Sequence, residues 1–384
     1  MTTLIGVATL AAACSSGTGD AASSDDTSSG DAPSEKSVET AAVYPDPDWN
    51  EITPEEAGVD PVVLQEMADL AQAGGSNCLV VTRNGELVGE YYWNGTDATT
   101  PRELFSATKS ITSALVGIAS DRGELDIDEP ASKYITEWQG TDSEDVTIRN
   151  LLSNDSGREW DFITDYVEMG IQAPDKTRFS TDLGQQFEPG TEWEYNNAAI
   201  QTLDAVLEEA TGMDPGDYAD RYLFEPTGME ATYGHDPAGN ANMFFNVQAS
   251  CRDLARFGYL WLRDGEWADD EQVVSADYVE ESITPTELNS AYGFLFWLNR
   301  PGHWVKPSTL AGKPEGEGVP IEGVPEDAFF AEGLGGQVSV VYPSTGIVFT
   351  RMAPGDLEKA ANARDADVVP ELQRLAAQLV PDEG

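Results

Sequence analysis

The sequence is poor in positive charge, in histidine, in cysteine and in long apolar runs. Its 384 residues include 21 Lys and Arg against 69 Asp and Glu, which gives a formal net charge of −48. Nucleic acid is excluded as a partner because phosphate binding needs a basic surface, and no polybasic patch is available for anionic lipid. No apolar run reaches the roughly 18 residues of a membrane-spanning helix. Two histidines and three cysteines are too few for a typical protein-only zinc site, so we expect no metal and no cofactor.

The negative charge is spread over the whole chain. Residues 15–60 have a net charge of −11 and residues 61–384 one of −37, so an acidic tail does not account for the total. Ordinary solubility is one explanation. The presence of only seven lysines favours another, adaptation to a salty habitat, where salt screens the repulsion within an acidic surface.

The first 48 residues predict an exported chain on a flexible tether. Residues 3–13 are small and apolar, and the stretch LAAAC that ends at Cys14 resembles a bacterial lipobox. We expect a signal peptide over residues 1–14 and lipid attachment at Cys14. No basic residue precedes the apolar run, so a cleaved secretory signal and a start codon placed too far downstream stay open. Residues 15–48 are too rich in Ser, Thr, Gly and Asp to fold, and the folded domain should span residues 49–384 of an extracytoplasmic protein.

The remaining cysteines are expected to pair. An exported protein meets an oxidising compartment, and with Cys14 assigned to lipid only Cys78 and Cys251 are left. A disulfide between them would close a long loop and stabilise the fold by several kcal/mol. Two separate buried thiols are the alternative.

Strand-like segments lie at both ends of the domain, with helical segments between them. Residues 79–93 predict a hairpin around an Asn-Gly turn, and residues 336–342 and 346–352 alternate like strands. Helices are predicted over residues 106–121 and 370–379 and over most of a helical insertion at about 125–265, including 198–211 and 251–263. This order predicts an α/β (α+β) fold, an antiparallel sheet flanked by helices with an all-α subdomain.

One serine stands out once the common hydrolase signatures are found missing. The sequence has no G-x-S-x-G, no H-E-x-x-H and no P-loop, and His235 and His303 are interpreted as surface or structural residues. Ser106 and Lys109 are three residues apart at the start of a buried helix, which places both side chains on one face. Burial lowers the pKa of a lysine, so its neutral amine can take the proton of the serine.

Two further segments could complete this site. Tyr195 and Asn197 stand two residues apart on a turn before a helix, from which both side chains can enter one cleft. A tyrosine near a lysine can serve as a phenolate base or as a proton shuttle. Residues 331–337 are rich in glycine and enter a strand, which allows a substrate to approach the backbone closely.

The order and spacing of these three motifs carry a family resemblance. The chain resembles the serine β-lactamase and penicillin-binding protein superfamily, and within it the class C-type and 6-aminohexanoate-dimer hydrolase-like enzymes. Supporting stretches are residues 149–161, 187–190 and 252–258, and the likeness covers roughly residues 51–384. It implies a β-lactamase/transpeptidase-like fold.

The resemblance also implies a role for each matched residue. Ser106 would be the acylated nucleophile, Lys109 its base, and Tyr195 the relay that passes protons to the leaving group and later from the hydrolytic water. Asn197 would hold the substrate or the lysine. The backbone N–H groups of Ser106 and Leu334 would form the oxyanion hole, which contributes roughly 10²–10³ in rate per donor.

The third motif departs from the penicillin-recognising members, which carry Lys-Thr-Gly or His-Thr-Gly. Here the corresponding residues are Ala331, Glu332 and Gly333, so the cation that contacts a substrate carboxylate is missing and an acid stands nearby. This disfavours β-lactams and D-Ala-D-Ala peptides and fits an esterase or amidase acting on neutral or amine-bearing substrates. A solvated surface charge is the alternative for Glu332.

The sequence thus predicts a serine hydrolase of a small-molecule amide or ester substrate, which works without metal or cofactor. We expect a monomer that touches the membrane only through its N-terminal lipid. A β-lactamase or DD-peptidase, and a non-catalytic cell-envelope binding lipoprotein, remain as alternatives. The loops expected to shape the cleft, residues 155–185 and 300–330, show no sequence pattern that identifies the acyl group of the substrate.

Overall fold

The computed structural model describes residues 42–45, 47–268, 271–354 and 368–381. The predicted signal peptide, Cys14 and most of the predicted tether lie outside these residues. The compact unit begins at Ala42, earlier than the boundary predicted near Trp49. Tyr44 contacts the rings of Tyr259 and Trp267, and the Tyr259 hydroxyl donates to the Val43 carbonyl at 2.7 Å, so the end of the predicted tether packs on the domain.

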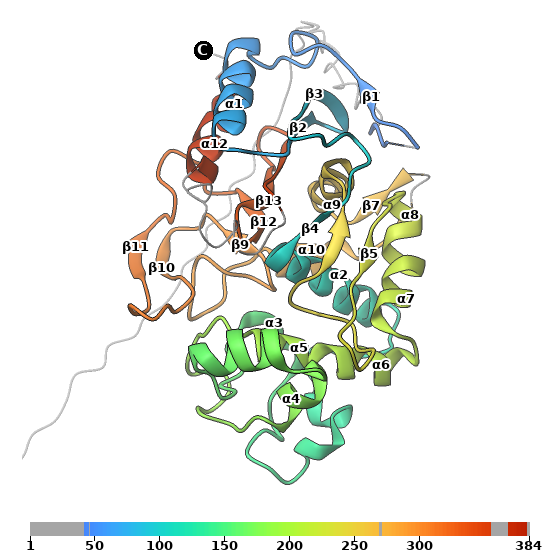
Figure 1. Cartoon of the computed structure of the whole chain (residues 1–384), viewed down its shortest axis with the longest axis vertical. Helices are drawn as coiled ribbons and strands as arrows, with labels where there is room; N and C mark the ends of the chain where they lie inside the picture. The colour runs from blue at the N-terminus through green and yellow to red at the C-terminus, as the bar shows by residue number, and fades with distance from the viewer. Residues whose placement is uncertain (1–41, 46, 269–270, 355–367, 382–384) are drawn as a thin grey trace, which may run out of the picture. The chain divides into compact units, whose positions relative to one another are not determined.

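A seven-stranded sheet joins the two ends of the described chain (Figure 1). Its order is β1-β3-β2-β14-β13-β12-β9, and all neighbours are antiparallel except β1 and β3. The predicted antiparallel sheet with strands from both chain ends is confirmed. The strands are β1 Asn50–Glu51, β2 Cys78–Arg83, β3 Glu86–Tyr92, β9 Trp297–Leu298, β12 Phe329–Gly333, β13 Gln337–Tyr342 and β14 Ile347–Met352.

The hairpin and the alternating strands follow directly from local sequence. Asn84 and Gly85 have φ of 51° and 88°, which matches the turn that an Asn-Gly pair favours between twisted strands. Along β2, Leu79 and Val81 join one apolar cluster, whereas Cys78 and Val80 join the other. Period-two alternation therefore feeds two cores, one on each face of the sheet.

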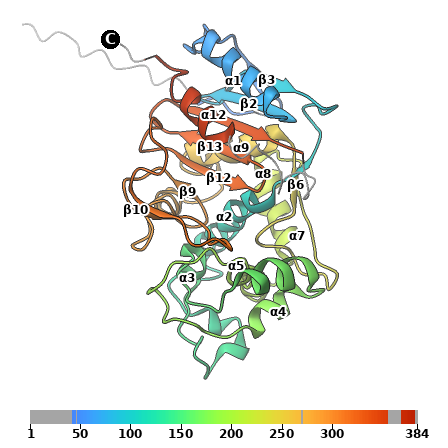
Figure 2. The same cartoon turned by 60° about the vertical axis from the view of Figure 1, so that its left-hand side comes forward.

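Helices cover both faces. α1 (Pro61–Ala73) and α12 (Val368–Ala376) share one apolar cluster with the sheet, and they lie together at one side of it in Figure 2. α2 (Thr108–Asp121) and α9 (Cys251–Leu262) belong to the larger cluster on the opposite face. None of the helices in the described ranges is long and apolar enough to cross a membrane.

Helix α9 corrects the predicted extent of the helical insertion. α9 packs mainly on β2, β13 and β14 of the sheet, and less on the inserted helix α8 (Glu225–Thr227). A Cβ atom on Gly258 would lie 2.5 Å from Ser339 Oγ, so the helix can approach the sheet closely only because this residue is glycine. The predicted pair Cys78 and Cys251 forms a disulfide, with the Cα atoms 6.5 Å apart, and it ties the start of α9 to β2.

The inserted helices form a second layer, with α3, α4 and α5 below the sheet in Figures 1 and 2. The insertion comprises α3 Ile148–Ser153, the π-helical η4 Ile163–Gln172, α4 Lys176–Asp182, α5 Asn197–Gln201, α6 Leu203–Thr211, α7 Pro215–Ala219, the π-helical η5 Asp220–Phe224 and α8 Glu225–Thr227. The shorter elements are the turns η1 Phe105–Ala107, η2 Ala131–Lys133 and η3 Thr136–Trp138, the helix α10 Ala276–Ser282, and the strands β4 Arg102–Glu103, β5 Thr232–Tyr233, β6 Val247–Ala249, β7 Glu266–Trp267, β8 Glu271–Gln272, β10 Gly302–Val305 and β11 Glu315–Gly318.

Candidate active site

Ser106 lies in the short turn η1 that leads into α2, and the regular helix begins at Thr108. Phe105, immediately before the serine, has a φ of 47°, a left-handed conformation that costs a non-glycine residue about 1–3 kcal/mol. Its N–H donates to Glu103 Oε1 at 3.2 Å. The surrounding contacts therefore hold a strained turn, and strain of this kind gathers at functional sites.

Lys109 is positioned to take the proton of the serine. Its Nζ lies 2.9 Å from Ser106 Oγ and donates a second hydrogen bond of 2.9 Å to the Phe244 carbonyl. The side chain is buried at the start of α2. Burial lowers the pKa of Lys109 to about 7, and the charge of Asp165 opposes that fall. A large fraction of the amine is therefore neutral at neutral pH, as a general base requires.

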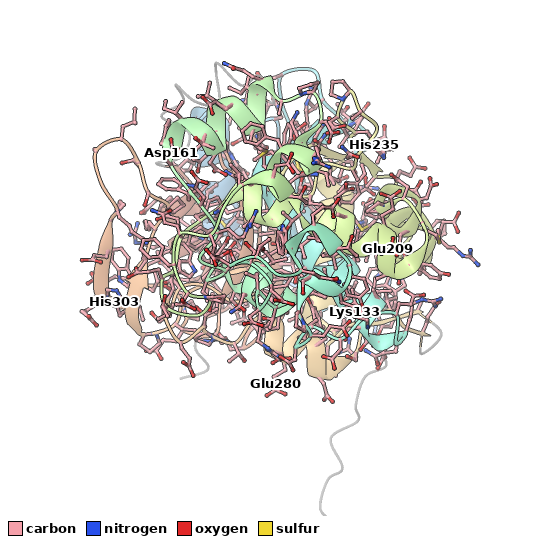
Figure 3. The ribbon with its side chains drawn as sticks, turned by 90° about the horizontal axis from the view of Figure 1, so that it is seen from below. Lys133, Asp161, Glu209, His235, Glu280 and His303 are labelled. Carbon is pink, nitrogen blue, oxygen red and sulfur yellow. A yellow bond between two sulfur atoms is a disulfide. The ribbon has the colours of Figure 1, made fainter. Side chains whose placement is uncertain are left out.

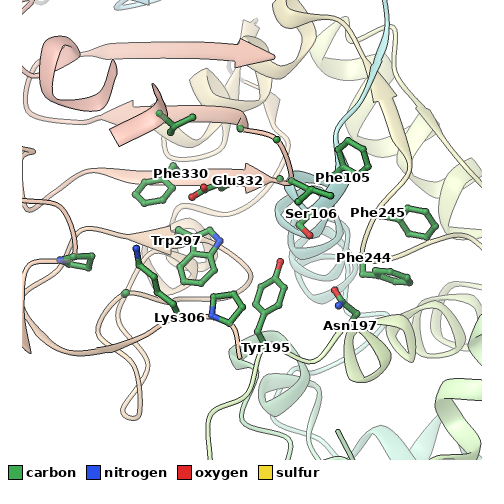
Figure 4. Close-up of a pocket in the computed structure, with 18 of the residues that line it drawn as sticks. Phe105, Ser106, Tyr195, Asn197, Phe244, Phe245, Trp297, Lys306, Phe330 and Glu332 are labelled. Atoms are coloured by element: carbon green, nitrogen blue, oxygen red, sulfur yellow. The ribbon is translucent and has the colours of Figure 1, made fainter. Parts of the chain in front are cut away.

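Tyr195 completes the cluster from the loop before α5. Its hydroxyl points toward Ser106 (Figure 4), and Lys109 Nζ lies 4.7 Å from the centre of its ring. Burial raises the pKa of Tyr195 well above its ordinary value, and the hydrogen bond with Ser106 only partly opposes this rise. The tyrosine therefore stays protonated at neutral pH, which fits a proton relay better than a phenolate base.

Asn197 lines the same cleft, but its hydrogen bond does not go to the lysine. Its Nδ2 donates to Asp165 Oδ2 at 2.6 Å, and the Ala198 N–H donates to Oδ1 of the same carboxylate at 2.8 Å. Asp165 comes from η4 and is buried, and burial raises its pKa to about 6. Two roles were predicted for Asn197, and no hydrogen bond joins it to Lys109 in the structure, because its amide donates to Asp165 instead.

The end of β12 lies against the turn that carries the serine. A Cβ atom on Gly333 would lie 2.1 Å from the Leu104 carbonyl oxygen and 3.1 Å from Ser106 N, so only glycine permits this approach. Among the described residues, no hydrogen bond uses the backbone N–H of Ser106 or of Leu334. Both groups are free to donate to a substrate oxygen.

These residues open into a cavity of about 840 Å³ whose walls are mostly apolar. Its apolar side chains include Phe244, Phe245, Trp297, Trp304, Ile321 and Leu334. Four charged side chains also line it, those of Glu103, Lys306, Glu332 and Arg374. Such a lining suits a small substrate that is largely apolar and is oriented by few polar groups.

The two histidines lie elsewhere, as the sequence analysis expects. Neither His235 nor His303 lines the cavity, and they stand at opposite edges of the view in Figure 3. His235 Nε2 lies 3.1 Å from Asp214 Oδ1, and His303 Nδ1 lies 3.3 Å from Glu317 Oε1. Within the described ranges, no three His, Cys, Asp or Glu side chains gather as a metal site.

Three residues of this site were missed by the sequence analysis, namely Asp165, Phe244 and Lys306. Each comes from a segment distant in sequence from Ser106, and the Lys109–Phe244 bond spans 135 positions. Phe244 contributes a backbone carbonyl, which leaves no mark in the residue type. Asp165 lies on η4 and Lys306 directly follows β10. Both segments were expected to be cleft loops without a readable pattern, so no local signal identified these two residues.

Comparison with known proteins gives one family match. A family model described as Beta-lactamase matches residues 59–373. The chain is 28% identical over 255 residues to 6-aminohexanoate-dimer hydrolase of Paenarthrobacter ureafaciens, in an alignment that covers 59% of this chain and 64% of that protein. It is 32% identical over 143 residues to esterase EstB of Burkholderia gladioli, covering 33% of this chain and 36% of the esterase. The chain thus aligns with less than two thirds of the length of these curated relatives.

Solved structures resemble the fold over more of its length. A penicillin-binding protein homologue from Caulobacter crescentus superposes with a TM-score of 0.58 at 16% identity, covering 80% of this chain and 98% of that one. A β-lactamase from Mycobacterium bovis superposes with a TM-score of 0.55 at 18% identity, covering 80% and 99%. At such identities the likeness concerns the fold, which is β-lactamase/transpeptidase-like as predicted.

Proposed function

The chain belongs to the Beta-lactamase family, and on this premise we propose that it is a serine hydrolase that cleaves small amides or esters through an acyl-enzyme at Ser106. One observation carries the proposal. The Nζ of Lys109 lies 2.9 Å from Ser106 Oγ and belongs to a lysine whose pKa burial lowers to about 7. That pairing is the arrangement of an activated nucleophile and its base.

In the acylation step, neutral Lys109 takes the hydroxyl proton of Ser106 while Oγ attacks the carbonyl carbon. The oxygen of the resulting tetrahedral intermediate accepts hydrogen bonds from the N–H groups of Ser106 and Leu334. Tyr195 donates its phenolic proton to the leaving nitrogen or oxygen, and the ammonium of Lys109 returns a proton to the tyrosine. The bond to the leaving group breaks, and the acyl group stays on the serine.

Deacylation reverses these proton transfers with water as the nucleophile. The water gives a proton to the Tyr195–Lys109 pair as its oxygen attacks the acyl carbon, and the same N–H groups stabilise the oxyanion. When the tetrahedral intermediate collapses, Ser106 Oγ leaves with a proton and the free acid is released.

Amide or ester hydrolysis is the favoured activity because of the cleft and the curated relatives. The relatives include 6-aminohexanoate-dimer hydrolase and esterase EstB, and the cavity walls are mostly apolar. A β-lactamase or DD-peptidase is the second candidate, favoured by one observation. Lys306 lines the cavity and could contact a substrate carboxylate, although it does not come from the third motif.

A fluorophosphonate probe, a panel of p-nitrophenyl esters and anilides, and nitrocefin test this proposal. We expect Ser106-dependent labelling and ester or amide turnover that are both lost in Ser106→Ala. Ser110→Ala is the matched control, since Ser110 is a buried serine on the same helix that donates to the Leu295 carbonyl. Absence of Ser106-dependent labelling would leave a non-catalytic binding protein, and efficient nitrocefin hydrolysis would favour the second candidate.

We also propose that the protein works outside the cytoplasm, anchored through lipid on Cys14, as a monomer. The disulfide between Cys78 and Cys251 supports an oxidising compartment. Metabolic labelling with radioactive palmitate tests the anchor, and a Cys14→Ala variant that still takes up label would refute it. Sedimentation analysis tests the oligomeric state.

A further inference from the structure

Glu332 places a carboxylate in the wall of the cleft beside the catalytic serine. Phe330 and Glu332 are two residues apart on β12, share one face of the strand, and both line the cavity (Figure 4). The next residue, Gly333, touches the turn that bears Ser106. The predicted alternative of a merely solvated surface charge therefore does not describe this residue.

The carboxylate has no direct partner in the described part of the chain. The backbone of Glu332 pairs with Val338 of β13, but no hydrogen bond or ion pair joins its carboxylate to another described residue. The cation that acts on it is Lys306, whose charge opposes the rise in the Glu332 pKa that burial causes. Lys306 is exposed, and its Nζ lies 5.8 Å from the ring centre of Trp304, outside ion-pair distance of Glu332. An anion that is largely removed from water and not directly paired is costly to keep unless a ligand compensates it.

We propose that Glu332 binds a protonated amine of the substrate, so that the enzyme prefers amides and esters carrying an ammonium group near the scissile carbonyl. The inference rests on the proposed hydrolase function and names its substrate class. Glu332 and Leu334, whose N–H would hold the carbonyl oxygen, are two residues apart along the chain, which corresponds to about 7 Å in an extended strand. Trp297 and Trp304 also line this cavity, and aromatic rings of this kind attract cations.

Lys306 has the opposite effect in this arrangement. As a cation at the same cavity, it favours the ionised form of Glu332 and competes with the substrate ammonium for that carboxylate. Replacing Lys306 with methionine should therefore strengthen the preference for an amine, whereas replacing Glu332 with glutamine should weaken it. Two changes of opposite sign separate a charge effect from a general loss of packing.

The test compares three p-nitrophenyl esters of similar length, the 5-aminopentanoyl, hexanoyl and adipoyl esters, at low ionic strength. We expect kcat/KM to be about 10- to 100-fold higher for the amine than for the neutral ester, and lowest for the carboxylate. In Glu332→Gln the amine-to-neutral ratio should fall at least about tenfold. Glu317→Gln, which removes an exposed carboxylate on β11, should leave that ratio unchanged.

The ammonium can lie on the acyl side or on the leaving-group side of the scissile bond, so a second pair covers the other side. Hexanoate esters of 3-aminopropanol and of butanol are compared by acid release in the same variants. The proposal is overturned if neither pair shows a preference for the amine that Glu332→Gln reduces, or if Lys306→Met reduces it.

Failure of the proposed function would look different. If no ester is cleaved through Ser106, equilibrium binding of pentylamine and of pentanol can still be measured by calorimetry, because it needs no catalysis. Tighter binding of pentylamine that is lost in Glu332→Gln would support the amine site without the hydrolase. Equal binding in both proteins would refute it.

Discussion

Removing the charge of Asp165 should extend the activity of this protein to lower pH. The base Lys109 works only when neutral, so kcat/KM should rise with pH through the pKa of its amine. Asp165 is an anion that favours the protonated, inactive form. In Asp165→Asn that stabilisation is gone, the pKa of Lys109 falls further, and the rise in activity moves to lower pH.

The magnitude follows from the two competing effects on Lys109. Burial lowers its pKa from 10.5 to about 7, which corresponds to about 5 kcal/mol against the ammonium form. Asp165 is held by Asn197 and Ala198 rather than by the amine, so its removal should lower the apparent pKa by less than a contact ion pair would, about 0.5–1. At pH 6.5 the neutral fraction then rises about two- to threefold, with little change above pH 8.

The assay is the pH dependence of kcat/KM for a neutral p-nitrophenyl ester in wild type and in Asp165→Asn. The readout is the pH at the midpoint of the rise in kcat/KM. Losing the carboxylate that holds Asn197 can lower the maximal rate, but it does not by itself move this midpoint. Glu168→Gln is the matched control, since Glu168 is an exposed acid on the same helix, η4. A midpoint that stays in place or moves to higher pH would refute the assignment of Lys109 as the base under the influence of Asp165.

Three other predictions follow from the fold. Arg351 donates to the Gly335 and Gly336 carbonyls at 2.6 and 3.1 Å and so fixes the turn that presents the Leu334 N–H. Arg351→Met should therefore lower kcat about tenfold or more, with a smaller change in KM, and Arg351→Lys should recover part of the loss. A change in the melting temperature alone would contradict this role. Reducing the disulfide, which spans 173 positions, should lower the free energy of unfolding by about 2–5 kcal/mol, seen as an earlier urea transition with reductant than without it. Raising NaCl toward 1 M, where the Debye length is about 3 Å, should raise the melting temperature of this acidic chain, and a flat or falling curve would contradict adaptation to salt.

Local sequence patterns predicted several parts of the fold and of the site. The Asn-Gly hairpin, the alternating strands β13 and β14, and the placement of Ser106 with Lys109 were all predicted, because each rests on residues only a few positions apart. The pairing of Cys78 with Cys251 was favoured by elimination among three cysteines. In each case few alternatives compete, so a local pattern or a short list is enough.

The features that the sequence did not predict depend on contacts between segments far apart in the chain. Helix α9 has the amphipathic pattern of any surface helix, and the pattern does not say that the sheet rather than the inserted helices receives its apolar side. Asn197 was matched to a motif, but the atom that it bonds, on Asp165, comes from the π-helical η4, in a segment that the sequence indicated as a loop. The third motif lacks the lysine or histidine of the penicillin-recognising members. The structure nevertheless brings a cation, Lys306, to the same cavity from another segment.

The sequence by itself predicted that Ser106 and Lys109 lie together, because their contact depends on spacing along one turn, and the order of the three motifs indicated Tyr195 and the family fold through a resemblance. Only the tertiary structure decided the protonation states of that machinery and the charges around it. Whether Lys109 is neutral, Tyr195 protonated and Glu332 unpaired depends on burial and on groups from other segments of the chain, such as Asp165 and Lys306, and neither is encoded in any local pattern. The same distinction separates the chemistry of the site, which the motifs predict, from its substrate, which the assembled walls of the cleft select.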